Sequence, residues 1–207
     1  MSKARLEAFS DGVIAILITI MILELHVPTG SSWDALQHEL PALLAYVLSF
    51  VYLGIYWSNH HHMLAAVSRV DGVTLWANLH LLFWLSLIPF STAWMSERRF
   101  PATPTAVYGI VLLAAAIAYL ILQTALLRAE GASSRLRTAL GRDLKGKLSA
   151  FLYCLAIGAT FADRRLGLAL YVTVAVIWLV PDRRFERDPA GGASGPRDER
   201  QGLAAGG

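Results

Sequence analysis

The side chains best suited to chemistry in this 207-residue chain are polar groups at the edges of long apolar runs. Ser10 and Asp11 stand near the start of the first run, where a carboxylate is costly unless it is paired or hydrated. They could simply cap the start of a helix. We favour a buried polar cluster that fixes the first helix against its neighbours. In that cluster, the candidate partners of Asp11 are Arg5, Asn59, His61 and Asn78.

A histidine run, His60-His61-His62, raises the question of a metal site, because imidazole is the commonest metal ligand. Neighbouring residues on a helix point about 100° apart, so three in a row cannot easily share one ion. We therefore expect no metal, and interfacial polar residues of which one joins the Asp11 cluster; a pH-sensing role is the remaining alternative. The chain has no P-loop, GxSxG or HExxH motif, so we expect neither an enzyme nor a cofactor.

The elements that carry these residues are predicted to be membrane helices. Hydrophobic residues make up 56% of the chain and charged residues 16%, against roughly 25% charged in soluble domains. Six apolar segments approach the 17–25 residues that a spanning helix needs. They are residues 8–27, 40–60, 73–95, 104–127, 147–162 and 164–181. The sequence thus predicts an all-α membrane protein, with a kink at Pro89 and a tight hairpin at Ala162–Arg165.

Charge placement predicts the topology and excludes nucleic acid as a partner. Most of the 18 lysines and arginines flank segments that an inside N-terminus would place in the cytoplasm, including the loop 128–147. The outer loops would hold only Arg98, Arg99, Arg164 and Arg165. We expect a multi-pass protein with both termini in the cytoplasm. Residues 1–182 would form the membrane domain and residues 183–207 a disordered cytoplasmic tail.

The first helix also carries an apolar stripe. Ile16, Thr19 and Leu23 are spaced i, i+3 and i+7 and so share one face, with Ile20 close in angle to Thr19. Such a stripe alone usually means packing. No second copy of the opening motif follows, so a symmetric path would need several copies of the chain.

The opening motif resembles a known family. Arg5-x-x-x-Phe9-Ser10-Asp11-Gly12, followed by an Ile-rich helix ending in Leu23-Glu24-Leu25-His26-Val27-Pro28, is similar to the potassium channel family of transmembrane protein 175. Trp57–His61 and Ser86–Phe90 resemble further signatures of that family. The last three apolar segments add only hydropathy to the resemblance.

The resemblance implies a homotetrameric, potassium-selective channel in a bacterial plasma membrane, with potassium as the permeant ion. The pore would be lined by the first helix of each subunit, without a TVGYG carbonyl filter. Ile16 and Leu23 would form constriction rings, with either Thr19 or Ile20 between them. Arg5, Phe9, Ser10, Asp11, Asn59, His61 and Asn78 would form the supporting polar network. The alternative is a proton-coupled secondary transporter, in which Asp11 and the histidines would relay protons.

Overall fold

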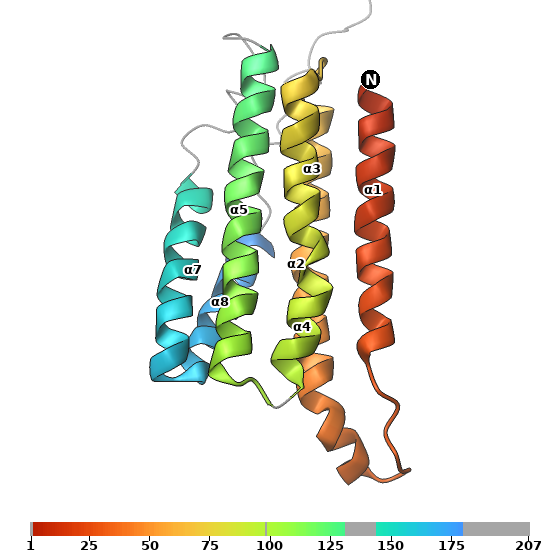
Figure 1. Cartoon of the computed structure of the whole chain (residues 1–207), viewed down its shortest axis with the longest axis vertical. Helices are drawn as coiled ribbons and strands as arrows, with labels where there is room; N and C mark the ends of the chain where they lie inside the picture. Colours follow the sequence, from red (N-terminus) through yellow and green to blue (C-terminus); the bar gives the residue numbers. More distant parts are fainter. Residues whose placement is uncertain (1, 98, 131–143, 180–207) are drawn as a thin grey trace, which may run out of the picture.

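A computed structural model of the chain describes residues 2–97, 99–130 and 144–179, whose helices pack side by side as a bundle (Figure 1). The helices are α1 (Lys3–Ile20), the 3₁₀ turn η1 (Met21–Glu24), α2 (Trp33–Ala65), α3 (Gly72–Ser86), α4 (Ile88–Ser96), α5 (Ala102–Glu130), α7 (Leu144–Ala162) and α8 (Arg164–Leu179). The predicted all-α class is confirmed for these residues. The predicted tail, 183–207, and most of the loop 128–147 lie outside them.

Four helical stretches are long and apolar enough to cross a membrane: Lys3–Glu24, Trp33–Ala65, Gly72–Ser96 and Ala102–Glu130. The prediction of several membrane helices is confirmed by these four. The helices α7 and α8 are shorter, with 19 and 16 residues. A count of six spans therefore stays a prediction.

The first helix begins earlier than its apolar run. Ser2 is the N-cap of α1, so Ser10 and Asp11 lie within the helix and do not cap it. The α-helical hydrogen bonding stops at Ile20, and η1 continues the chain to Glu24 in the tighter 3₁₀ form. Five residues of α1 therefore precede the apolar run that begins at residue 8, and Leu23 lies in η1.

The third predicted segment is a broken helix. The helix α3 stops at Ser86 and α4 starts at Ile88, with Pro89 in the first turn of α4. Proline lacks the N–H that would continue the ladder, and its ring crowds the preceding turn. The kink expected at Pro89 thus occurs two residues ahead of it, at Leu87.

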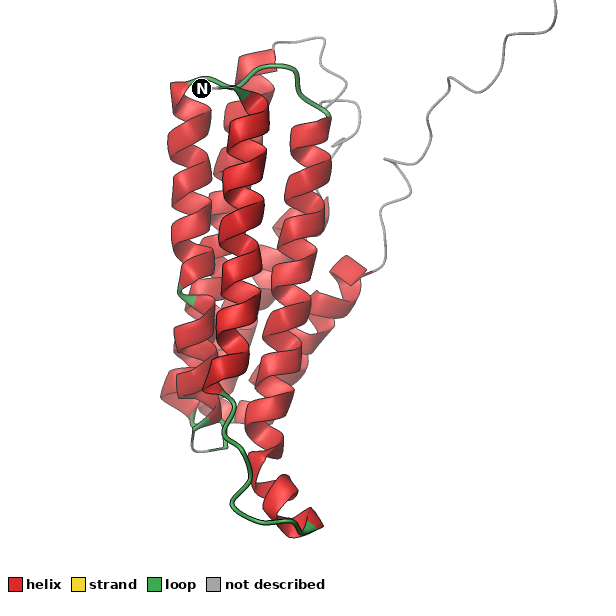
Figure 2. Ribbon diagram, turned by 90° about the vertical axis from the view of Figure 1, so that its right-hand side faces the viewer, coloured by secondary structure: helices red, strands yellow, loops and turns green. Residues whose placement is uncertain are grey.

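The arrangement of the helices leaves α1 at one edge of the bundle, where it packs on α2 and α3 (Figure 1). The α7–α8 hairpin forms the opposite edge, against α5 (Figure 1). Its turn is as tight as predicted: Asp163 alone separates the two helices, and its carboxylate accepts a hydrogen bond of 2.8 Å from the Arg165 N–H. Figure 2 shows that the first residues of α2 extend past the other helices at the end where η1 lies.

Buried hydrogen bonds join the middle of the bundle. The Ser49 hydroxyl on α2 lies 2.7 Å from the Thr92 hydroxyl on α4 and 3.0 Å from the Tyr108 hydroxyl on α5. The Tyr52 hydroxyl donates to the carbonyl oxygen of Tyr171 on α8 at 2.6 Å. These bonds satisfy polar groups that would be costly to bury alone, and they fix α4, α5 and α8 around α2.

Candidate functional site

The helix α1 has two unlike faces. Ile14 and Leu17 are 1% and 7% exposed and belong to the core, together with Leu6 and Met21. On the other face, Ile16 is 56% exposed and Leu23 is 79% exposed. An apolar face this open on a membrane helix must be covered by lipid or by another protein chain, because water would not solvate it.

The predicted ring residues all lie on the exposed face. Ile16, Thr19, Ile20 and Leu23 are exposed, whereas Ile18 is half-buried against the core. The Thr19 hydroxyl donates back to the carbonyl oxygens of Ala15 and Ile16, at 3.1 and 3.0 Å. Its oxygen remains able to accept a bond or contact an ion. A single subunit does not decide between Thr19 and Ile20 as the middle position, because both are open.

A buried chain of hydrogen bonds holds the other face of α1. The Asn78 side-chain N–H donates to the Ser10 hydroxyl at 2.9 Å, and Ser10 donates to the Leu6 carbonyl oxygen at 2.9 Å. The Asn78 amide oxygen lies 2.8 Å from His60 Nε2. This oxygen can only accept, so the His60 proton sits on Nε2. The trio of Ser10, His60 and Asn78 therefore joins α1, α2 and α3 with its polar groups satisfied.

Asp11 lies outside this trio, on the partly open side of α1. Its carboxylate accepts a hydrogen bond of 3.0 Å from Trp57 Nε1. The Trp57 ring stacks on the His61 ring, with centroids 6.1 Å apart and planes inclined by 25°. Asp11, Trp57 and His61 thus form a second group, which we call the rim group.

The remaining residues of the predicted network are placed apart from both groups. The Asn59 amide donates to the Ile55 carbonyl oxygen at 2.8 Å, one turn back on its own helix. Arg5 and Phe9 lie exposed on α1. Within the described ranges, the ion pair at this end of α1 joins Lys3 to Glu7 at 3.7 Å.

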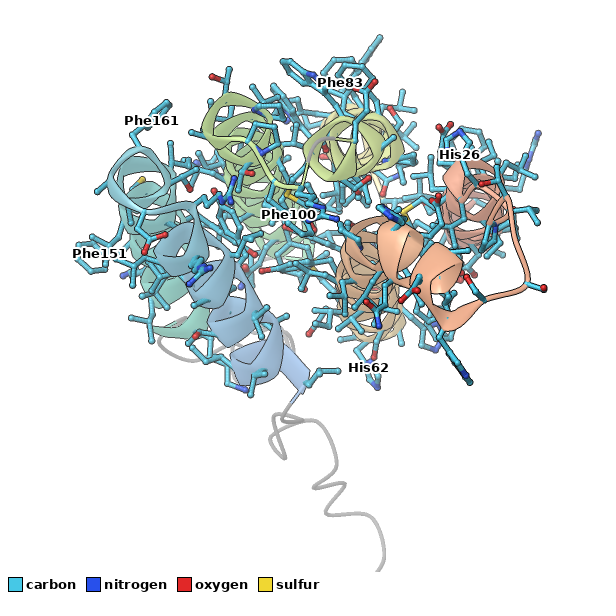
Figure 3. The ribbon with its side chains drawn as sticks, turned by 90° about the horizontal axis from the view of Figure 1, so that it is seen from below. His26, His62, Phe83, Phe100, Phe151 and Phe161 are labelled. Carbon is cyan, nitrogen blue, oxygen red and sulfur yellow. The ribbon has the colours of Figure 1, made fainter. Side chains whose placement is uncertain are left out.

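The three adjacent histidines point in different directions, as helical geometry requires. His60 is buried in the trio and His61 stacks on Trp57. His62 lies 2.6 Å from the Ser58 carbonyl oxygen and points away from the bundle (Figure 3). Among the residues that the structure describes, no three His, Cys, Asp or Glu side chains come together to hold a metal ion.

Sequence reasoning missed two residues of this site, His60 and Trp57. The signal for His60 was present: Tyr52, Tyr56 and His60 are spaced by four residues, and Met63 continues the same buried face of α2. Extending that period would have selected His60 over His61 as the buried histidine. The sequence carries no comparable signal for Trp57, because its bond to Asp11 depends on how α1 and α2 pack.

Comparison with known proteins bears directly on this site. Residues 5–89, which contain both groups, match the sequence model of the family described as endosomal/lysosomal potassium channel TMEM175. A potassium channel of Chryseobacterium sp. (strain P1-3) is 52% identical over 187 residues, covering 90% of this chain and 97% of that protein. A potassium channel of Streptomyces collinus is 35% identical, covering 85% of this chain and 91% of its own.

A solved structure is also similar. The crystal structure of a lysosomal potassium-selective channel TMEM175 homolog from Chamaesiphon minutus superimposes with a TM-score of 0.70 and 28% sequence identity. The match covers 86% of this chain and 96% of that one, so it extends well beyond the opening motif.

Proposed function

The chain belongs to the TMEM175 family of potassium channels and is not an enzyme, and we propose that four copies of it form a potassium-selective channel in the plasma membrane. The first helix of each copy lines the pore. Potassium is the ion that passes, and it is not a bound cofactor.

The observation that carries this proposal is the exposed apolar face of α1 in the single subunit. Four such faces around one axis would cover one another and enclose a narrow path. Ile16 and Leu23 would then form apolar rings, which gate by dewetting and remove part of the hydration shell of an ion. The buried trio supports this geometry, because it fixes which face of α1 is turned outward from its own subunit.

Selectivity for potassium is supported by the relatives. The Chryseobacterium and Streptomyces proteins are named potassium channels, and their similarity to this chain covers 97% and 91% of their own lengths. This chain contains no TVGYG segment. Discrimination between potassium and sodium would therefore depend on the side chains of the rings, with Thr19 as the candidate hydroxyl.

A proton-coupled transporter is the less favoured alternative. Its proton relay would need titratable groups along the path, yet no charged residue lies between Gly12 and Leu23 of the first helix. His60 already uses its Nε2 proton in a buried bond to Asn78. These contacts suit a fixed support for α1 better than a proton relay.

A planar-bilayer recording of the purified chain tests the proposal. With a potassium gradient across the bilayer and sodium making up the balance of cation on the dilute side, we expect current without any added substrate and a reversal potential close to the potassium equilibrium value. A reversal potential near zero would contradict selectivity, and flux that needs a coupled substrate would contradict a channel.

A further inference from the structure

Arg5 lies on the same side of α1 as the proposed constriction. Ile16 follows Arg5 by 11 residues, and 11 steps of about 100° bring a helix back to within about 20° of its first direction. Both side chains are exposed, whereas Leu6 and Ile14 of the same helix are buried in the core. When Ile16 faces the pore axis, Arg5 therefore faces it too, about 16 Å closer to the start of α1.

The charge of Arg5 is not cancelled by the nearest acidic side chains of its own helix. A guanidinium group is always protonated in proteins. The ion pair at this end of the described helix joins Lys3 to Glu7 at 3.7 Å and so engages the nearest carboxylate. Asp11 bonds to Trp57, and its six-residue separation from Arg5 turns it about 120° away around the helix. Four copies of Arg5 would therefore give one end of the pore four positive charges.

The other end of the path carries the opposite charge. Glu24 directly follows Leu23 and is exposed at the end of η1. Residues 21–40 contain no lysine or arginine, and their charged residues are Glu24, Asp34 and Glu39. Figure 1 places this segment at the end of the bundle away from the start of α1. The macrodipole of α1 has the same sense, positive at its Lys3 end and negative at its Ile20 end.

These charges are close enough to act on an ion at either mouth. Helices in contact lie about 8–10 Å apart, so four of them around one axis would each lie roughly 6 Å from it. This distance is shorter than the Debye length of about 8 Å at physiological salt. No charged residue lies between Gly12 and Leu23 to offset them. Four charges at such a distance change the local potassium concentration by several fold.

We propose that the pore is electrically asymmetric, so that potassium enters more readily from the Glu24 end than from the Arg5 end. Arg5 sets the barrier at its end, because four guanidinium groups repel the entering cation. The current carried from the Glu24 end is therefore the larger one, and the difference shrinks as salt screens the charges. This inference rests on the proposed tetrameric pore and concerns the direction of current, which is a separate property from the choice of ion.

Single-channel recording with the same KCl solution on both sides of a bilayer tests the proposal. At equal and opposite voltages, the wild-type chain should pass unequal currents in about 0.1 M KCl and nearly equal currents in about 1 M KCl, where the Debye length is about 3 Å. The ratio of the two currents does not depend on which way round the channel inserts. It also does not depend on selectivity, so a channel that failed the potassium–sodium gradient could still pass this test.

Substitutions at the two ends assign the asymmetry to its charges. In about 0.1 M KCl, Arg5→Gln should raise the smaller current about twofold or more, and Glu24→Gln should lower the larger one. Arg69→Gln is the control for the first, because Arg69 is exposed in the loop between α2 and α3 and does not lie on α1. Asp163→Asn is the control for the second, since Asp163 is exposed at the opposite edge of the bundle (Figure 1). Both controls should keep the wild-type ratio.

Two results would overturn the proposal: equal wild-type currents at both polarities in low salt, or an unchanged smaller current in Arg5→Gln channels. Size-exclusion chromatography shows whether Arg5→Gln still assembles. If it does not, the salt series of the wild type decides, because an asymmetry that stayed the same from about 0.1 M to 1 M KCl could not come from fixed charges at the mouths.

Discussion

At the scale of single residues, the buried trio should contribute most to the stability of the channel core. Asn78→Ala would leave His60 and Ser10 without their shared partner in a buried site. Each unsatisfied buried group costs about 1–3 kcal/mol, so we expect a large fall in the unfolding temperature and weaker retention of the oligomer in detergent. Size-exclusion chromatography and thermal unfolding measure both effects.

Asn59→Ala is the matched control for the trio, because the Asn59 amide bonds only one turn back along α2. It should change stability much less than Asn78→Ala. Equal effects of the two substitutions would mean that the trio is not the fastening point of α1.

A second prediction at this scale concerns the start of α3. The Asp71 carboxylate accepts bonds of 2.8 Å from both the N–H and the hydroxyl of Thr74. These bonds favour the charged form and lower the pKa of Asp71 from 3.8. The stabilisation is therefore present at neutral pH and is lost as the pH falls below 3.8, through the lowered pKa of the folded state.

Asp71→Ala should accordingly lower the unfolding temperature at pH 7, and its difference from the wild type should shrink at acid pH. Ser32→Ala provides the control. Ser32 caps α2 by accepting a bond from the Ala35 N–H at 3.2 Å and carries no titratable group. Its effect should be the same at both pH values, and a difference for Asp71→Ala that did not change with pH would refute the assignment.

At the scale of elements, close approach of backbones predicts which glycines are essential. A Cβ at Gly167 on α8 would lie 2.0 Å from Thr160 Oγ1 and 3.1 Å from the Ala156 carbonyl oxygen on α7. Gly167→Ala must therefore separate the two helices of the hairpin and should clearly destabilise the protein. Gly158→Ala, on the facing helix with nothing within 4 Å of its Cβ, should not. Thermal unfolding of the two variants decides whether the hairpin packs this way.

The elements were more predictable from the sequence than the site. Apolar runs and breakers such as Pro28, Asp71 and Pro101 place the helices to within a few residues. In lipid each backbone N–H and C=O must find a partner within the protein, and an α-helix satisfies them within one segment of chain. The apolar run alone gives a late start for α1, because the residues of the helix before residue 8 are mostly polar. The break at Leu87 was foreseen as a kink, since Pro89 acts on its own helix.

The polar contacts between helices were not predictable in the same way. The types of Ser10, Asn78 and Asp11 marked them as candidates, but which of them meet depends on helix rotation and depth. We expected His61 in the buried cluster, but His60 is the histidine that faces α3 and bonds to Asn78. We expected Arg5 beside Asp11, but Trp57 faces α1 from α2 and bonds to Asp11. A single sequence shows the spacing of apolar residues along each helix. It does not show how neighbouring helices are rotated or shifted relative to one another.

At the scale of the whole molecule, the proposed orientation places the two ends of α2 on opposite sides of the membrane. Ser31 precedes the outer end and Ala65 ends the inner one, and both are exposed. In a Cys154→Ser background, a membrane-impermeant thiol reagent added to intact cells should label Ser31→Cys and leave Ala65→Cys unlabelled. Labelling of Ala65→Cys alone would reverse the topology that the basic flanks predict.

The constriction belongs to this scale as well, because no single subunit can form it. We expect Ile16 of four subunits to make the narrowest ring, with the Leu23 ring about 12 Å away, from four α-helical rises of about 1.5 Å and three 3₁₀ rises of about 2.0 Å. A smaller polar side chain would hydrate the narrow ring and lower the barrier to an ion. Ile16→Asn should therefore raise the single-channel conductance and move the reversal potential, under a potassium–sodium gradient, toward zero.

Ile18→Asn is the matched control for this ring, since Ile18 lies on the same helix and packs half-buried against the core of its own subunit. Its polar group would be turned into apolar packing, at a cost in folding, so we expect less assembled protein and unchanged selectivity in the channels that do form. If Ile18→Asn altered the reversal potential while Ile16→Asn left conductance and reversal potential at wild-type values, the pore would lie on the other face of α1. The exposed stripe would then be a contact with lipid, because the two faces of one helix cannot both meet the axis.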